Sequence, residues 1–250
     1  MECWVSTVSC VSWLMIVGGL AYMLHQNRTC APYGRYSPAR GRCCSARTGW
    51  FLQEVPAFLL PLLLLLLDSG TGTRTGRMLL STFMLHYFYR SFVYSLLTRG
   101  QPIPLKIVVF AFTFCSINGL LQGHNLLHCT RFQNTWLTRA RITAGSLLFL
   151  VGLTINIHSD NILRNLRKPG ELVYRIPRGG MFEFVSGANF LGEITEWFGY
   201  AVAAWSLPAF AFAFFTLCSI GPRAYQHHRD YQLRFQDYPR SRKALIPFIF

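Results

Sequence analysis

Three polar residues recur at helical spacing in the apolar stretch 187–204. Asn189, Glu193 and Glu196 follow one another at i, i+4 and i+7, so a helix places them on one face. Carboxyl groups in an apolar helix are costly to bury and are therefore candidates for a functional role. We expect this face to bind a polar ligand or to take part in chemistry.

A third carboxyl, Glu54, follows Gln53 in another apolar stretch, and Tyr87 lies in a further one. A buried carboxyl must either pair with a positive charge or be protonated, because an isolated charge is unfavourable in a low dielectric. A protonated carboxyl together with a phenol can polarise a ketone oxygen. The alternatives are a solvated carboxyl at the level of the lipid headgroups and a tyrosine in an interfacial aromatic belt. Aromatic residues suited to an apolar pocket around this pair are Trp50, Phe114, Trp197, Phe212 and Phe215, and the combination indicates reduction of an apolar carbonyl compound.

Polar and charged residues at helical spacing form two further stripes. One is Asn156, Asp160, Arg164 and Arg167, which the pair Pro169-Gly170 should terminate. It could equally be an Asp/Arg pair on a solvated helix end. The other stripe consists of Arg223, His227, Tyr231 and Arg234, which could also be a basic helix resting on anionic lipid.

These stripes favour a nucleotide bearing several phosphates, because guanidinium groups match phosphate geometry. Groups available for negative charge are Arg167, Lys168, Arg175, Arg178 and Arg223, and groups available for amides and sugar hydroxyls are Asn156, Asp160, Asn189 and Glu193. The segment Gly70-Thr71-Gly72 lacks the strand and helix of a dinucleotide fingerprint. A dinucleotide would therefore lie between helices.

The composition indicates which elements must position these residues. The 250 residues are 52% hydrophobic and only 14% charged, against roughly 25% charged in soluble domains. Seven stretches are long and apolar enough to cross a membrane: 4–24, 51–67, 78–98, 105–127, 142–158, 187–204 and 206–221. We expect an all-α integral membrane protein, a seven-transmembrane-helix bundle forming one domain over residues 1–250. The first stretch has no preceding basic region, so we expect it to be retained and not cleaved as a signal peptide.

The net charge of +14 is explained by this topology. The basic residues interrupt apolar runs and do not cluster on one face, as they would in a nucleic-acid-binding protein. With the N-terminus outside, the inside segments hold 18 of the 24 Lys and Arg residues and the outside segments hold 5. The positive-inside rule therefore predicts a lumenal N-terminus and a cytosolic C-terminus. Cys30, Cys43 and Cys44 fall on the cytosolic side, where we expect free thiols.

Two other chemistries lack support in the sequence. His124 and His128 precede Cys129 without the general-base carboxylate of a helical zinc motif, so we expect no metal site. The sequence also lacks a G-x-S-x-G elbow, which gives hydrolase chemistry no support.

Seven segments of the chain resemble the steroid 5α-reductase family, and its type 2 pattern in particular. The resemblance extends from about residue 33 to residue 250 and covers segments 50–54, 86–88, 156–160, 166–171, 174–177, 186–193 and 243–250. It implies a seven-helix enzyme of the endoplasmic reticulum membrane that uses NADPH to reduce the Δ4 double bond of 3-oxo-steroids. Hydride transfer to C5 would precede protonation at C4.

The resemblance also implies roles for individual residues. Glu54 and Tyr87 match the pair that hydrogen-bonds the 3-oxo group. The positions associated with NADPH are Asn156, Asp160, Arg167, Tyr174, Arg175, Asn189, Glu193, Arg223, His227 and Tyr231. The steroid pocket is matched by Trp50, Phe114, Trp197 and Phe215, and we expect Gln53 to line it as well. We expect a monomer that takes its steroid from the bilayer.

Four residues depart from the family pattern: Gln101, Phe110, Ser219 and Pro222. They bear on substrate preference and cofactor affinity. Two alternatives are a membrane-embedded prenylcysteine-type methyltransferase and a non-enzymatic sterol-binding protein. Binding of S-adenosylmethionine would indicate the methyltransferase, and steroid binding without turnover would indicate the non-enzymatic protein.

Overall fold

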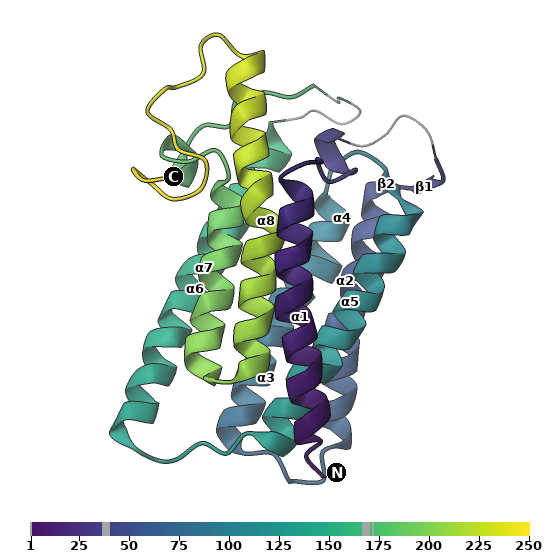
Figure 1. The fold of residues 1–250 in the computed structure, drawn as a ribbon, viewed down its shortest axis with the longest axis vertical. Helices are drawn as coiled ribbons and strands as arrows, with labels where there is room; N and C mark the ends of the chain where they lie inside the picture. The colour runs from purple at the N-terminus through teal and green to yellow at the C-terminus, as the bar shows by residue number, and fades with distance from the viewer. Residues whose placement is uncertain (1, 37–40, 167–170, 172) are drawn as a thin grey trace.

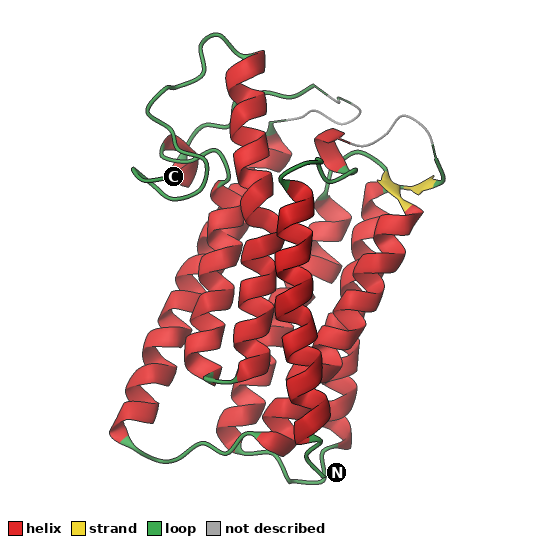
Figure 2. Cartoon of the chain, in the orientation of Figure 1, coloured by secondary structure: helices red, strands yellow, loops and turns green. Residues whose placement is uncertain are grey.

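A computed structural model describes residues 2–36, 41–166, 171 and 173–250. The regular secondary structure of the described chain is almost entirely helical (Figure 2). The long helices are α1 (Val5–Gln26), α2 (Ala46–Leu67), α3 (Arg74–Phe88), α5 (Leu105–His124), α6 (Trp136–Asn165), α7 (Ala188–Ala204) and α8 (Leu207–Arg234). Shorter elements are η1 (Gly34–Tyr36), β1 (Cys43–Cys44), η2 (Tyr89–Tyr94), α4 (Ser95–Leu97), β2 (Ile103–Pro104), η3 (Asn125–Cys129) and η4 (Gly180–Glu183).

The long helices pack side by side into one bundle, with the N-terminus at one end and the C-terminus at the other (Figure 1). The pairs with the most extensive contacts are α6 with α7, α2 with α5 and α1 with α8. At the end that holds the C-terminus, β1 and β2 form a two-stranded antiparallel sheet that pairs Cys43 with Pro104. This sheet ties the start of α2 to the start of α5.

Five helical segments of the described chain are long and apolar enough to cross a membrane: 5–26, 46–67, 105–129, 136–165 and 207–234. The expected spans 78–98 and 187–204 are also helical, but α7 has 17 residues and α3 has 15 before it passes into the π-helix η2. The all-α membrane bundle is therefore confirmed.

Helices α6 and α7 touch backbone to backbone because glycines line their interface. A Cβ atom added at Gly152 would lie 2.2 Å from the backbone nitrogen of Glu196, and one at Gly192 would lie 2.4 Å from that of Asn156. Small residues allow this close approach between membrane helices. The contact fixes the polar face of α7 against the polar stripe of α6.

The core around this interface is aromatic. Trp197 is fully buried, with its ring centroid 4.5 Å from that of Phe212 and 5.6 Å from that of Phe83. Aromatic pairs at such distances are favourable beyond the area they bury. They hold α3, α7 and α8 together beside the candidate site.

Candidate functional site

A cavity of about 320 Å³ opens between the helices in the half of the bundle where the predicted polar residues gather. Ligand sites typically have volumes of about 300–1,000 Å³. Glu54, Gln53 and Trp50 line this cavity from α2, and Tyr87 lines it from α3. Other walls are provided by Ile107, Phe110, Phe114, Phe212, Phe215 and Ser219. We call it the apolar cavity, and it combines an apolar wall with a few convergent polar groups.

Arg90 connects the carboxylates at the polar end of the apolar cavity. Its Nη2 lies 3.2 Å from Oε1 of Glu54, and its Nη1 lies 3.3 Å from Oδ2 of Asp160. The guanidinium also lies over the rings of Trp50 and Tyr94, 4.7 and 4.2 Å from their centroids. Arg90 is buried, so both carboxylates gain a partner in a region of low dielectric.

The π-helix η2 begins one residue before Arg90 and follows α3 directly. Single π turns inside helices occur frequently at functional sites because they change the direction of the side chains that follow. Spacing within one helix could not identify Arg90 as the partner of Glu54 and Asp160, because these residues lie on other helices.

His86 and Glu196 form a second buried pair. Nδ1 of His86 lies 2.8 Å from Oε1 of Glu196, and the two side chains are 2% and 0% exposed. His86 also lines the apolar cavity, whereas Glu196 does not. Glu196 therefore lies behind His86 as seen from the cavity.

Trp197, predicted to line the steroid pocket, and Asn156, predicted to bind the cofactor, both lie behind the cavity walls. Trp197 does not line either of the described cavities but packs against Tyr87 and His86, with ring centroids 5.8 and 4.6 Å away. Asn156 is buried and donates from Nδ2 to the backbone oxygen of Asn189 at 3.0 Å. Both residues support groups that line a cavity.

A second cavity, of about 200 Å³, lies beside the apolar cavity and has a polar, basic lining. Arg223, His227, Asn189, Asp160, Trp50, Tyr94 and Tyr33 line both cavities, so the two are neighbours with common walls. The basic cavity is also lined by Tyr174, Arg175, Tyr231, Arg164 and Gln101. Glu193 lines the apolar cavity only.

The loop after α1 covers the basic cavity. Nη1 of Arg35 lies 2.6 Å from Oδ2 of Asp230, and its guanidinium lies over the rings of Tyr174 and Tyr231, 4.7 and 4.3 Å from their centroids. Burial lowers the pKa of Arg35, but Tyr231 and Asp230 raise it by more, so the guanidinium stays charged. Sequence analysis missed Arg35 because the loop has no helical periodicity.

The basic cavity fits an anionic group bearing phosphates. Arg223 is buried, its Nε has no hydrogen-bond partner among the described residues, and its guanidinium lies 4.0 Å from the Tyr33 ring centroid. An unpaired buried guanidinium is costly unless a ligand supplies the negative charge. Arg167 and Lys168 lie outside the described residues. Arg175 is exposed and pairs with Glu171 at 3.0 Å.

The segment after η4 is held in place by the C-terminal tail. The backbone nitrogens of Ser186 and Gly187 donate to the carbonyls of Lys243 and Ala244 at 2.8 and 3.0 Å. The buried Arg242 donates to the carbonyl of Pro177 at 2.7 Å. These bonds set the start of α7, which carries Asn189 and Glu193.

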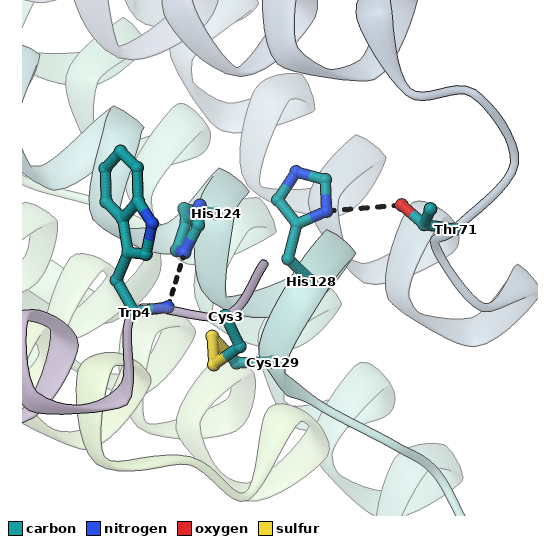
Figure 3. The surroundings of a disulfide bond; sticks show 6 residues. All are labelled: Cys3, Trp4, Thr71, His124, His128 and Cys129. Carbon is teal, nitrogen blue, oxygen red and sulfur yellow. Dashed lines mark hydrogen bonds between the residues drawn. A yellow bond between two sulfur atoms is a disulfide. The ribbon is translucent and has the colours of Figure 1, made fainter. Parts of the chain in front are cut away.

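At the opposite end of the bundle a disulfide joins Cys3 to Cys129 (Figure 3). Beside it, the backbone nitrogen of Trp4 donates to Nε2 of His124 at 3.2 Å. Sequence analysis did not predict this bond. Cys30, Cys43 and Cys44 are free, as expected.

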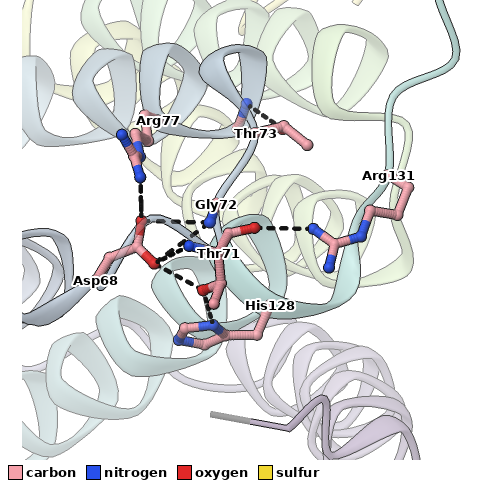
Figure 4. A network of polar contacts seen from close by, with 8 residues as sticks. Asp68, Thr71, Gly72, Thr73, Arg77, His128 and Arg131 are labelled. Carbon is pink, nitrogen blue, oxygen red and sulfur yellow. Dashed lines mark hydrogen bonds and ion pairs between the residues drawn. The ribbon is translucent and has the colours of Figure 1, made fainter.

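The turn between α2 and α3 lies at the same end of the bundle (Figure 1), and Figure 4 shows its polar contacts. Asp68 accepts hydrogen bonds from Thr71 and from Arg77, whose Nη2 lies 2.8 Å away. Thr71 in turn contacts Nδ1 of His128 at 3.2 Å. No group of three or more metal-ligating side chains occurs in residues 2–36, 41–166, 171 and 173–250.

Comparison with known proteins identifies the family. The model for "3-oxo-5-alpha-steroid 4-dehydrogenase" matches residues 101–250. The chain is 55% identical to "3-oxo-5-alpha-steroid 4-dehydrogenase 2" of Sus scrofa and to that of Homo sapiens, over 87% of this chain and 87% of each relative. It is 43% identical to "3-oxo-5-alpha-steroid 4-dehydrogenase 1" of Homo sapiens, over 97% of this chain and 95% of the relative.

The resemblance noted in the sequence is therefore confirmed, and with it the assignment as an enzyme. The apolar helices and the relatives together identify a multi-pass membrane oxidoreductase of steroid metabolism. The chain belongs to the 3-oxo-5-alpha-steroid 4-dehydrogenase family.

Proposed function

We propose that the protein reduces the Δ4 double bond of 3-oxo-steroids such as testosterone and progesterone-type substrates, with NADPH as the reductant. The observation that carries this proposal is the pair Glu54 and Tyr87 at the polar end of an apolar cavity, next to a basic cavity. A rigid, mostly hydrophobic ligand with one ketone matches the first cavity. A phosphorylated cofactor matches the second.

In this proposal, Tyr87 donates a hydrogen bond to the 3-oxo group. Arg90 holds Oε1 of Glu54, and the carboxyl donates to the same ketone when it carries a proton. Both interactions draw electron density toward the oxygen, which makes C5 electrophilic. Donors aimed at a developing oxyanion are usually a large contribution to catalysis.

NADPH, when bound, supplies a hydride for C5. Asp160, Asn189, Arg223, His227, Tyr231, Tyr174 and Arg175 line the cavity that would hold it. Asn156 would act by orienting the backbone of Asn189, and Glu193 would reach the nicotinamide end from the apolar cavity. Arg35 would add a positive charge that sequence reasoning did not include.

We further propose a single catalytic domain, active as a monomer, that crosses the endoplasmic reticulum membrane seven times. Seven long helical segments in chain order support this topology. The distribution of Lys and Arg supports a lumenal N-terminus and a cytosolic C-terminus. Gly34 and Arg35 of η1 line the basic cavity, and η1 lies at the end of the bundle that holds the C-terminus (Figure 1), so this orientation would give cytosolic NADPH access to the cavity.

Turnover by membranes that contain the protein tests the proposal. We expect conversion of testosterone to 5α-dihydrotestosterone with NADPH, and a lower rate when the Glu54→Gln variant replaces the wild type. Absence of conversion by folded protein would refute the proposal. Binding of S-adenosylmethionine in place of NADPH, or steroid binding without turnover, would instead support one of the alternative functions.

A further inference from the structure

The pair His86 and Glu196 is not used by the function proposed above. A buried pair of titratable groups contributes little to stability compared with apolar residues of the same volume. Within an apolar bundle such a pair is a candidate for a functional role. In the proposed reaction, the protonation of C4 is the step that has no assigned group.

The position of His86 fits that step. In a 3-oxo-steroid C4 is bonded directly to the carbonyl carbon, so an acid for C4 must lie close to the groups that bind the ketone. His86 precedes Tyr87 on α3, and their ring centroids lie 5.1 Å apart. Both residues line the apolar cavity together with Glu54.

The hydrogen bonding of His86 leaves one nitrogen for a ligand. Nδ1 is held by Glu196 at 2.8 Å, and the ring is packed at 61° against Trp197. A histidine fixed through Nδ1 presents Nε2 as its reactive atom. Since His86 lines the cavity and Glu196 does not, Nε2 is the part of the pair that can meet a substrate.

Glu196 is suited to support a charged imidazole. Its side chain is 0% exposed, and its second oxygen, Oε2, has no hydrogen-bond partner among the described residues. The carboxylate therefore depends on His86 for its compensating interaction. This resembles in principle the carboxylate that orients and stabilises an imidazolium in a catalytic triad.

We propose that His86 is the catalytic acid that protonates C4 and that Glu196 is its positioning residue. This inference rests on the proposed function. After hydride addition at C5, the electron pair of the double bond lies on C4 and the ketone oxygen as an enolate. The enolate forms a C–H bond at C4 with the proton from Nε2, and the electron pair of the N–H bond stays on the imidazole. Water entering the cavity returns the proton once the product has left.

The ionisation of His86 depends on neighbours from every helix around it. Glu196 and Glu193 face it from α7, Glu54 from α2 and Arg90 from its own helical segment. Cys115 on α5 lines the same cavity. Among these groups Glu196 is the one whose carboxyl is hydrogen-bonded to the imidazole, at 2.8 Å, so its replacement changes the hydrogen-bonded partner of the ring directly.

The test uses His86→Gln in the full-length protein, with His25→Gln as the control because His25 is exposed on α1. Glutamine can still hydrogen-bond Glu196 but cannot deliver a proton to carbon. We expect kcat to fall by about 10²–10⁴-fold, the usual range for loss of an acid–base group. Binding of NADPH and of the reduced product steroid, measured by fluorescence, should change less than about threefold.

Incorporation of deuterium from solvent at C4 of the product provides a readout that a purely structural role of His86 would not affect. In D₂O the wild type should place one deuterium on a single face of C4. The residual product of His86→Gln should lose that facial preference and show a larger solvent isotope effect on kcat. Normal kcat with an unchanged distribution of deuterium at C4 in His86→Gln would overturn the proposal.

Glu196→Gln keeps the test decisive if His86→Gln does not fold. An amide retains the hydrogen bond but not the negative charge, so the imidazolium loses stabilisation. The alkaline limb of the kcat–pH profile should shift to lower pH, and an unchanged limb would refute the role of Glu196. Glu2→Gln, at an exposed position, is the control. Lack of turnover by the wild type would refute the proposed function itself and is thus distinguishable from these outcomes.

Discussion

Arg90 and Asp160, which are 70 residues apart in the sequence, lie 3.3 Å apart between Nη1 and Oδ2. The same guanidinium binds Glu54 at 3.2 Å, so Arg90 of η2 connects α2 with α6. The alternative of an i, i+4 pair between Asp160 and Arg164 is not what the structure contains. Arg164 instead hydrogen-bonds Asn161.

Replacement of Arg90 by Met should leave Glu54 and Asp160 without their partner. Removal of one member of a buried ion pair typically costs about 3–5 kcal/mol. We expect a lower Tm in detergent, measured by intrinsic fluorescence, and loss of turnover. Arg47→Met is the matched control, since Arg47 is exposed on α2. Equal Tm values for the two variants would contradict the role of Arg90.

Replacement of Tyr87 by Phe removes a hydroxyl with little change in shape. If Tyr87 donates to the 3-oxo group, kcat should fall by about 10²–10³-fold, as for the loss of one oxyanion donor. Glu54→Gln should have a comparable effect. Steady-state kinetics with testosterone provide the measurement, and Phe92→Tyr, away from the described cavity linings, serves as a control. A variant of Tyr87 with near-normal kcat would refute its proposed contribution.

Replacement of Gly152 by Ala should separate α6 from α7. The added Cβ would lie 2.2 Å from the backbone nitrogen of Glu196, so backbone must move. We expect a loss of stability of about 1–3 kcal/mol, typical of overpacking, and weaker NADPH binding. Gly18→Ala on α1 is the control because a Cβ there meets nothing within 4 Å. Similar Tm and NADPH affinity in both variants would argue against the backbone contact.

The turn at Asp68 should make stability depend on pH in the acidic range. Burial raises the pKa of Asp68, but hydrogen bonds from Thr71 and Arg77 lower it by more, to about 2. The unfolded value is about 3.9, so the folded state favours the carboxylate. The stabilisation is complete above pH of about 4 and is lost as the pH falls toward 2.

Asp68→Asn should therefore lower Tm at pH 7, and the difference from wild type should shrink between pH 4 and pH 2. Asn keeps an acceptor for Thr71 but loses the charge that Arg77 binds. Thermal unfolding in an acid-tolerant detergent measures this difference. A difference that is constant across the range would show that the charge of Asp68 is not responsible.

The sequence predicted those features that repeat along one helix. The spacing of Asn189 and Glu193 and the apolar lengths were sufficient to locate the helices and the face of α7. It did not predict the pairs Arg90–Glu54 and His86–Glu196, because spacing within one helix does not say which helix lies opposite. Trp197 was expected in the pocket wall from its residue type and from the family resemblance, whereas the packing places it behind Tyr87.

The disulfide between Cys3 and Cys129 imposes a parity rule on the membrane crossings. Two bonded cysteines must face the same compartment, so the chain between them crosses the bilayer an even number of times. Three of the helices with clear spanning length lie between them, namely α1, α2 and the segment 105–129. Three is odd, so under the proposed seven-crossing topology the α3 segment supplies the fourth crossing. One covalent bond thus supports a crossing that the hydropathy of α3 alone does not.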